Sequence, residues 1–99
     1  MFFHVVMLQL ADADEAYLAR IRDYAARIRR DLPYVRDYRF GRNVADRAKG
    51  LTWAIVGTFD SAADHDRYQA SALHQEMKAF ITPHIADIAV CDFDAAGDE

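Results

Sequence analysis

The order of strand-like and helix-like segments constrains the fold of this 99-residue chain more than any other feature. A β-branched and aromatic run over residues 2–10 predicts a first strand. A helix over residues 12–32 follows, because apolar residues recur at three- and four-residue steps, and Pro33 ends it. The later segments alternate in the same way, so the order is β-α-β-β-α-β and predicts an α+β, ferredoxin-like protomer. These later segments are strands over 34–40, 51–59 and 85–93, and helices over 61–68 and 73–82.

Two helix starts carry capping signals. Asp12, with Glu15 three residues further on, is the expected N-cap of the first helix. Ser61 directly follows the strand that ends at Phe59, and it is the expected N-cap of the next helix. The chain is therefore expected to form one domain over residues 1–94, followed by an acidic C-terminal tail over residues 95–99.

Composition and charge narrow the class of protein. Hydrophobic residues make up 53% of the chain, which is enough for a core and argues against disorder. No apolar run approaches the roughly 20 residues that a membrane helix needs, so no membrane association is expected. The single cysteine, Cys91, cannot form an internal disulfide, which favours a reducing compartment. We therefore expect a soluble, cytoplasmic protein.

An arginine-rich segment raises the question of nucleic-acid binding. Eight arginines and three aspartates lie between Arg20 and Arg42, and RNA-recognition domains share the ferredoxin-like fold with a basic face. However, residues 51–59 do not match the third-strand motif on which such domains stack bases. The net charge of −4 also gives no reason to expect that partner. No nucleic-acid binding is predicted.

The strands are apolar on both faces, which predicts a homodimer. In the first strand Phe3, Val5 and Met7 point to one side, while His4, Val6 and Leu8 point to the other. Helices on one face of a four-stranded sheet leave the second face open to water. A second copy of the same sheet is the economical cover for that face.

Tyr68 and His74 are the candidate acid/base pair. His74 is expected at the start of a helix, where the macrodipole disfavours the imidazolium form, and a neutral imidazole can act as a general base. A phenol can donate a hydrogen bond to a developing enolate. The pair would suit proton abstraction next to a carbonyl group. The alternative is structural, with Tyr68 a half-buried aromatic residue and His74 a helix cap.

The other histidines are interpreted as structural. His4 in an apolar strand is either a core residue satisfied by one hydrogen bond or a polar contact in an apolar pocket. His65 and His84 are expected at the surface or at helix ends. No His, Cys or carboxylate pair has close ligand spacing, so no metal site is predicted. Gly57 either leaves room for a ligand or allows a helix to approach.

Several of these residues together resemble the stress-responsive dimeric α/β-barrel family, called Dabb. They are Gly41-x-Asn43, the run Leu51-Thr52-Trp53 leading to Phe59-Asp60-Ser61, the pair Tyr68 and His74, and Asp92-Phe93-Asp94 near the end. The resemblance implies that two ferredoxin-like sheets close into a dimeric α/β barrel. One departure is Ala72, because the family commonly has proline two residues before the histidine.

The resemblance also implies a function. The family includes stress-associated plant proteins without a settled activity and the polyketide cyclase that makes olivetolic acid, whose acid/base pair falls on Tyr68 and His74. A strand-one histidine of that cyclase falls on His4, and a pocket histidine falls on Trp53, so the substrate is not expected to carry over. The expected contacts with the ligand are His4, Val6, Leu8, Trp53, Ile55 and Met77.

We therefore predict a stress-responsive A/B barrel protein that binds a small apolar or aromatic molecule in the barrel. Catalysis by His74 and Tyr68 would be cyclase- or isomerase-like and would need no cofactor. A non-catalytic, stress-associated or ligand-binding homodimer is one alternative. A cofactor-free monooxygenase is the other, because related dimeric barrels carry out such chemistry.

Overall fold

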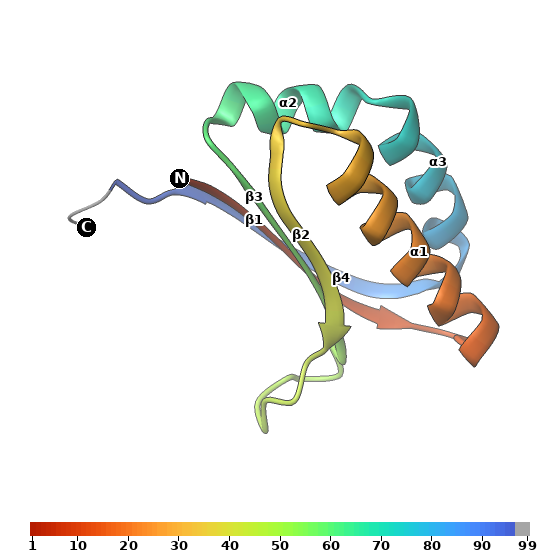
Figure 1. Ribbon diagram of the computed structural model, residues 1–99. Coiled ribbons are helices and arrows are strands. Elements are labelled where there is room, and N and C mark those ends of the chain that lie inside the picture. Colours follow the sequence, from red (N-terminus) through yellow and green to blue (C-terminus); the bar gives the residue numbers. More distant parts are fainter. Residues whose placement is uncertain (97–99) are drawn as a thin grey trace.

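The computed structural model describes residues 1–96, which form one antiparallel sheet and the helices that cover it (Figure 1). The strand order β2-β3-β1-β4 is that of a ferredoxin-like fold, so the predicted fold class is confirmed. Each pair of neighbouring strands is antiparallel. The elements are β1 (Phe2–Leu10), α1 (Glu15–Asp31), β2 (Val35–Arg42), β3 (Trp53–Phe59), α2 (Ala62–Ala70), α3 (Ala72–Ile81), the short 3₁₀ helix η1 (Thr82–His84) and β4 (Ile85–Asp94).

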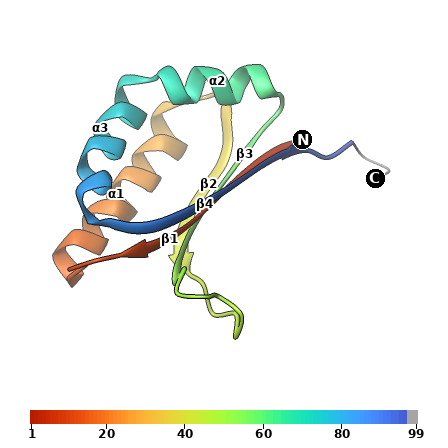
Figure 2. The same cartoon turned by 180° about the vertical axis from the view of Figure 1, so that it is seen from behind.

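All three α-helices lie on the same face of the sheet, and the opposite face is uncovered (Figures 1 and 2). Helix α1 packs against β2, and α2 and α3 follow each other along the top and the right side of the helical layer in the view of Figure 1. Strand β4 is an edge strand beside β1. The protomer therefore has two layers, with one face of the sheet covered by helices and the other face uncovered.

The first helix begins later than the sequence suggested. Asp12 is not the N-cap, because it has a positive φ of 56° and lies in the turn before the helix. Asp14 is the N-cap instead, and its carboxylate accepts a hydrogen bond of 2.8 Å from the Tyr17 N–H. The capping role of Ser61 is confirmed by the Asp64 N–H, which donates to its hydroxyl over 3.2 Å. In the predicted tail over 95–99, residues 97–99 lie outside the described part.

Asn43 of the Gly41-x-Asn43 motif holds the base of the β2–β3 loop. Its side-chain amide donates to the Leu51 carbonyl over 2.8 Å, and its side-chain oxygen accepts from the Ala45 N–H over 3.1 Å. Its backbone N–H also donates to the Thr52 carbonyl over 2.8 Å. This part of the motif is therefore structural.

The two faces of β1 differ as the sequence predicted. Val6 and Leu8 face the helices and are buried in the core. Phe3, Val5 and Met7 lie on the opposite, uncovered face and remain partly accessible. The uncovered face is thus apolar: Phe3 stacks on Phe93 of β4 with ring centroids 5.2 Å apart, and Val56 of β3 is 36% exposed.

No helix within residues 1–96 is both long enough and apolar enough to span a lipid bilayer.

Candidate functional site

A cavity of about 210 Å³ lies between the helix-covered face of the sheet and the helices α2 and α3. It opens along the edge strand β4, where the lining residues Ile88 and Val90 are 47% and 54% exposed. The cavity is lined by aliphatic side chains and by a few phenol and imidazole groups. A mainly apolar lining with a small number of polar groups is typical of a small-molecule site. The lining residues are His4, Val6, Leu8, Tyr38, Ile55, Tyr68, Gln69, His74, Met77, Lys78, Ile81, Thr82, Ile85, Ile88 and Val90.

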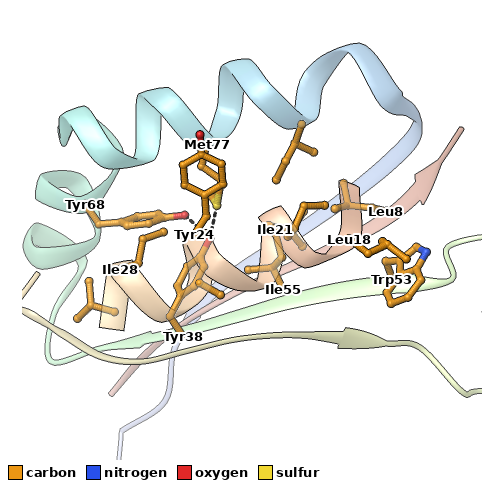
Figure 3. Close-up of a cluster of buried hydrophobic side chains, with 14 of the residues drawn as sticks. Leu8, Leu18, Ile21, Tyr24, Ile28, Tyr38, Trp53, Ile55, Tyr68 and Met77 are labelled. Atoms are coloured by element: carbon orange, nitrogen blue, oxygen red, sulfur yellow. Dashed lines mark hydrogen bonds between the residues drawn. The ribbon is translucent and has the colours of Figure 1, made fainter. Parts of the chain in front are cut away.

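The cavity brings together all of the predicted site residues except Trp53. Trp53 stacks on Phe40 with centroids 5.1 Å apart, and the Arg42 guanidinium lies 4.3 Å from its ring centroid. It sits at the opposite end of the core from Tyr68 (Figure 3). The cavity lies between the sheet and the helices of a single chain. The predicted ligand site was different: it was the interior of the dimeric barrel, which the uncovered face of the sheet would line.

Two buried tyrosines face each other above the sheet. The hydroxyl oxygens of Tyr38 and Tyr68 are 2.6 Å apart, and the Tyr38 hydroxyl also lies 3.9 Å from the Met77 sulfur (Figure 3). Burial raises the pKa of both phenols well above the ordinary value of 10. Tyr68 therefore keeps its proton at neutral pH and can act only as a hydrogen-bond donor or acceptor.

Tyr38 was not anticipated from the sequence, and Gly57 is the residue that makes room for it. Tyr38 pairs directly with Gly57 of β3. A Cβ at position 57 would lie 3.0 Å from the Tyr38 ring and 3.2 Å from the Phe59 ring. The missing side chain therefore accommodates the Tyr38 ring instead of a helix or a ligand.

Ser71 positions Tyr68 and His74 relative to each other. Its hydroxyl donates to the Tyr68 carbonyl over 2.7 Å and accepts from the His74 N–H over 3.2 Å. It is both the C-cap of α2 and the N-cap of α3. Ala72, where the family commonly has proline, is the first residue of α3, and the Ser71 cap forms the turn without it.

His74 has the tautomer that a general base requires. Its Nδ1 lies 3.0 Å from the Gln69 carbonyl oxygen, which can only accept, so Nδ1 carries the proton. In the neutral ring Nε2 therefore presents a lone pair. Burial, the largest cause, holds the pKa of His74 below its ordinary value of 6.5. The ring of Tyr68 packs against it with centroids 4.5 Å apart.

His4 is joined to an acidic residue from the far end of the chain. Residue 92 lies directly opposite residue 4 in the antiparallel register of β1 and β4. The His4 Nδ1 donates to the Asp92 carboxylate over 2.5 Å, while His4 itself is 5% exposed and lines the cavity. The hydrogen bond fixes the plane of the His4 ring.

His65 is not at the surface, in contrast to the sequence-based expectation. It is 5% exposed, and its ring packs on His4 with centroids 4.5 Å apart. It also contacts the rings of Phe2 and Phe59, at 4.9 and 5.2 Å. His84 follows the expectation of a helix-end position, because it is the last residue of η1, where it is half-buried. The helical period of α2 would have predicted the burial of His65, because His65 lies three residues before the buried Tyr68 and therefore on the same face of the helix.

The fold and the cavity define a ferredoxin-like α+β protein in which phenol and imidazole side chains converge on an apolar pocket. The sequence model of the family described as Stress responsive A/B Barrel Domain (Dabb) matches residues 2–95. The chain therefore belongs to this family. A search of curated proteins finds no significant match.

Several solved structures share the fold. A hydroxynitrile lyase from Passiflora edulis has a TM-score of 0.86 at 20% identity, with 99% of this chain and 95% of that chain covered. A dimeric ferredoxin-like protein of unknown function from Thermobifida fusca has a TM-score of 0.81 at 20% identity, covering 95% and 90%. An antibiotic biosynthesis monooxygenase has a TM-score of 0.77 at 17% identity, covering 97% and 99%.

Proposed function

We propose that the chain binds a small, mainly apolar or aromatic molecule in the cavity and moves a proton on it without a cofactor. The observation that carries this proposal is the convergence of Tyr68 and His74 on one cavity. Aliphatic side chains such as Val6, Leu8 and Ile55 would hold the apolar part of the ligand. A volume of about 210 Å³ suits a molecule of roughly one substituted aromatic ring.

The roles of the two groups follow from their surroundings. The Nε2 lone pair of His74 would take a proton from a carbon next to a carbonyl group, and the electron pair would move onto the carbonyl oxygen. Tyr68, whose own proton is held firmly, would donate a hydrogen bond to that oxygen. Either hydroxyl can be the donor in the Tyr38–Tyr68 hydrogen bond, and the Tyr68 proton is available to the ligand when Tyr38 is the donor. Cyclase- or isomerase-like steps both begin in this way.

The structural neighbours include a protein described as a hydroxynitrile lyase. At 20% identity this neighbour supports the fold alone, so it assigns no substrate to this chain. The likeness to a monooxygenase likewise carries no site residue to this chain.

The experiment is exchange of the acidic protons of aryl ketones and cyclic β-diketones in D₂O, followed by NMR with catalytic amounts of protein. The variants are His74→Gln and Tyr68→Phe, and His84→Gln is the matched control on a histidine that does not line the cavity. The His74→Gln variant should abolish the accelerated exchange. The second should lower it about 10²–10³-fold, the usual loss for one oxyanion donor. Ligand binding without exchange in the wild type would favour the non-catalytic alternative.

We also propose that the protein is a homodimer joined through the uncovered face of the sheet, in a reducing compartment such as the cytoplasm. The apolar side chains of Phe3, Val5 and Val56 on that face support the dimer, and neighbours of the same fold are described as dimeric. The single cysteine, Cys91, supports the compartment.

A further inference from the structure

One buried side chain near the cavity lacks a partner. Nε2 of His65 is the only buried side-chain nitrogen or oxygen within residues 1–96 that makes no hydrogen bond. The residue is 5% exposed. Leaving such a group unsatisfied costs about 1–3 kcal/mol, so its retention in the interior calls for an explanation.

The surroundings of His65 supply two more metal-ligand side chains. His4 of β1, His65 of α2 and Asp92 of β4 each offer one ligand atom, and these atoms lie within 4.8 Å of one another. The strand register places Asp92 opposite His4, and the packing of α2 lays the His65 ring over the His4 ring at an interplanar angle of 44°. Three elements that are distant in sequence therefore converge on one point.

We propose that His4, His65 and Asp92 bind one divalent transition-metal ion of the kind that Zn²⁺ represents. Two imidazoles and one carboxylate suit zinc, cobalt, nickel or ferrous iron better than calcium or magnesium, which prefer all-oxygen sites. Three protein ligands leave a further coordination position for water. The inference concerns binding and does not depend on the proposed catalysis.

Binding requires a small rearrangement that the structure permits. Metal–ligand distances are about 2.0–2.2 Å, so the His4 nitrogen and the Asp92 oxygen must move apart from their present 2.5 Å contact. The metal then takes the place of the proton between them. The Asp92 side chain is 35% exposed, which leaves its carboxylate free to rotate. At His65 no hydrogen bond has to break, because Nε2 makes none.

The test is a titration of the full chain, first stripped of metal by EDTA, with Zn²⁺ by calorimetry and with Co²⁺ by visible absorption. His65→Phe and Asp92→Asn remove ligands. Their matched controls are His84→Phe, which keeps the ring stack on Tyr17, and Asp94→Asn on the same strand. Wild type and controls should bind one ion per chain. The two ligand variants should bind at least about 10- to 100-fold more weakly, the loss that even an outer-shell change causes.

Folding is checked separately by circular dichroism and by thermal unfolding without metal. Zinc should raise the unfolding temperature of the wild type and leave that of His65→Phe unchanged. An anomalous signal from a Co²⁺-soaked crystal should lie among the three side chains. No saturable binding by the wild type, or equal losses in His65→Phe and His84→Phe, would overturn the inference and leave a buried water as the partner of His65. Proton exchange that persists in metal-free protein separates this result from the proposed function.

Discussion

Tyr68 and His74 lie ring against ring, with centroids 4.5 Å apart and planes at 53°, although they belong to different helices. On one continuous helix two residues six positions apart would point in different directions, since neighbours on a face are three or four residues apart. The break at Ser71 removes that difference. Its hydroxyl ties the Tyr68 carbonyl to the His74 N–H, so the local turn determines the geometry of the pair.

The burial of His74 predicts a pH dependence of stability. Its pKa is below 6.5 in the folded chain, so the unfolded chain binds the proton at higher pH. The free energy of unfolding should therefore hold its full value above about pH 6.5 and fall as the pH drops through the folded pKa. Urea unfolding from pH 8 to pH 5 measures this, and His74→Gln should reduce the slope. An unchanged slope in His74→Gln, or an equal change in the control His84→Gln, would contradict the assignment.

Gly57→Ala tests the packing that supports the tyrosine pair. The added Cβ would lie 3.0 Å from the Tyr38 ring, so the ring must shift away from its place over β3. The free energy of unfolding should fall by about 1–3 kcal/mol, the usual cost of overpacking. Chemical denaturation measures it. Gly41→Ala is the matched control, because a Cβ there meets nothing within 4 Å, and equal losses in the two variants would speak against this explanation.

Ala72→Pro should stabilise the chain. Ala72 is the first residue of α3, where proline costs no hydrogen bond, and the preceding Ser71 has the extended backbone (ψ 146°) that proline favours. A stiffer unfolded chain should raise the free energy of unfolding by about 0.4–1 kcal/mol. Thermal and urea unfolding are the measurements. A lower stability would show that the turn between Tyr68 and His74 does not tolerate the fixed φ of proline.

A charge on the uncovered face tests the proposed dimer. Val56→Lys places an ammonium group on that face of β3, whereas Val44→Lys changes a residue of the β2–β3 loop that is 85% exposed. Burying an unpaired charge at an interface is costly, so only the first variant should shift to monomer. Light scattering after size exclusion gives the mass. A monomeric wild type, or a dimer that survives in Val56→Lys, would argue against this interface.

The sequence was sufficient where structure depends on neighbours along the chain. The alternating segments predicted the ferredoxin-like fold, and the two faces of β1 followed from the period of a strand. The helix break before His74 and the cap at Ser61 are likewise local. Asp12 was assigned wrongly as a cap because Asp12 and Asp14 carry the same side chain, and only the backbone conformation distinguishes them.

Tertiary structure decided which side chains meet. His4 and Asp92 are 88 residues apart, and only the register of β1 against β4 makes them a pair. Tyr38 reaches Tyr68 because β3 has no side chain at Gly57, and His65 is buried because α2 turns it onto His4. Trp53 lies on the helix-covered face of the sheet, as the cavity does, but at the opposite end of the core from Tyr68. The local sequence determines the type of a side chain and the face on which it lies. Its partners depend on the packing of elements that are distant in the chain.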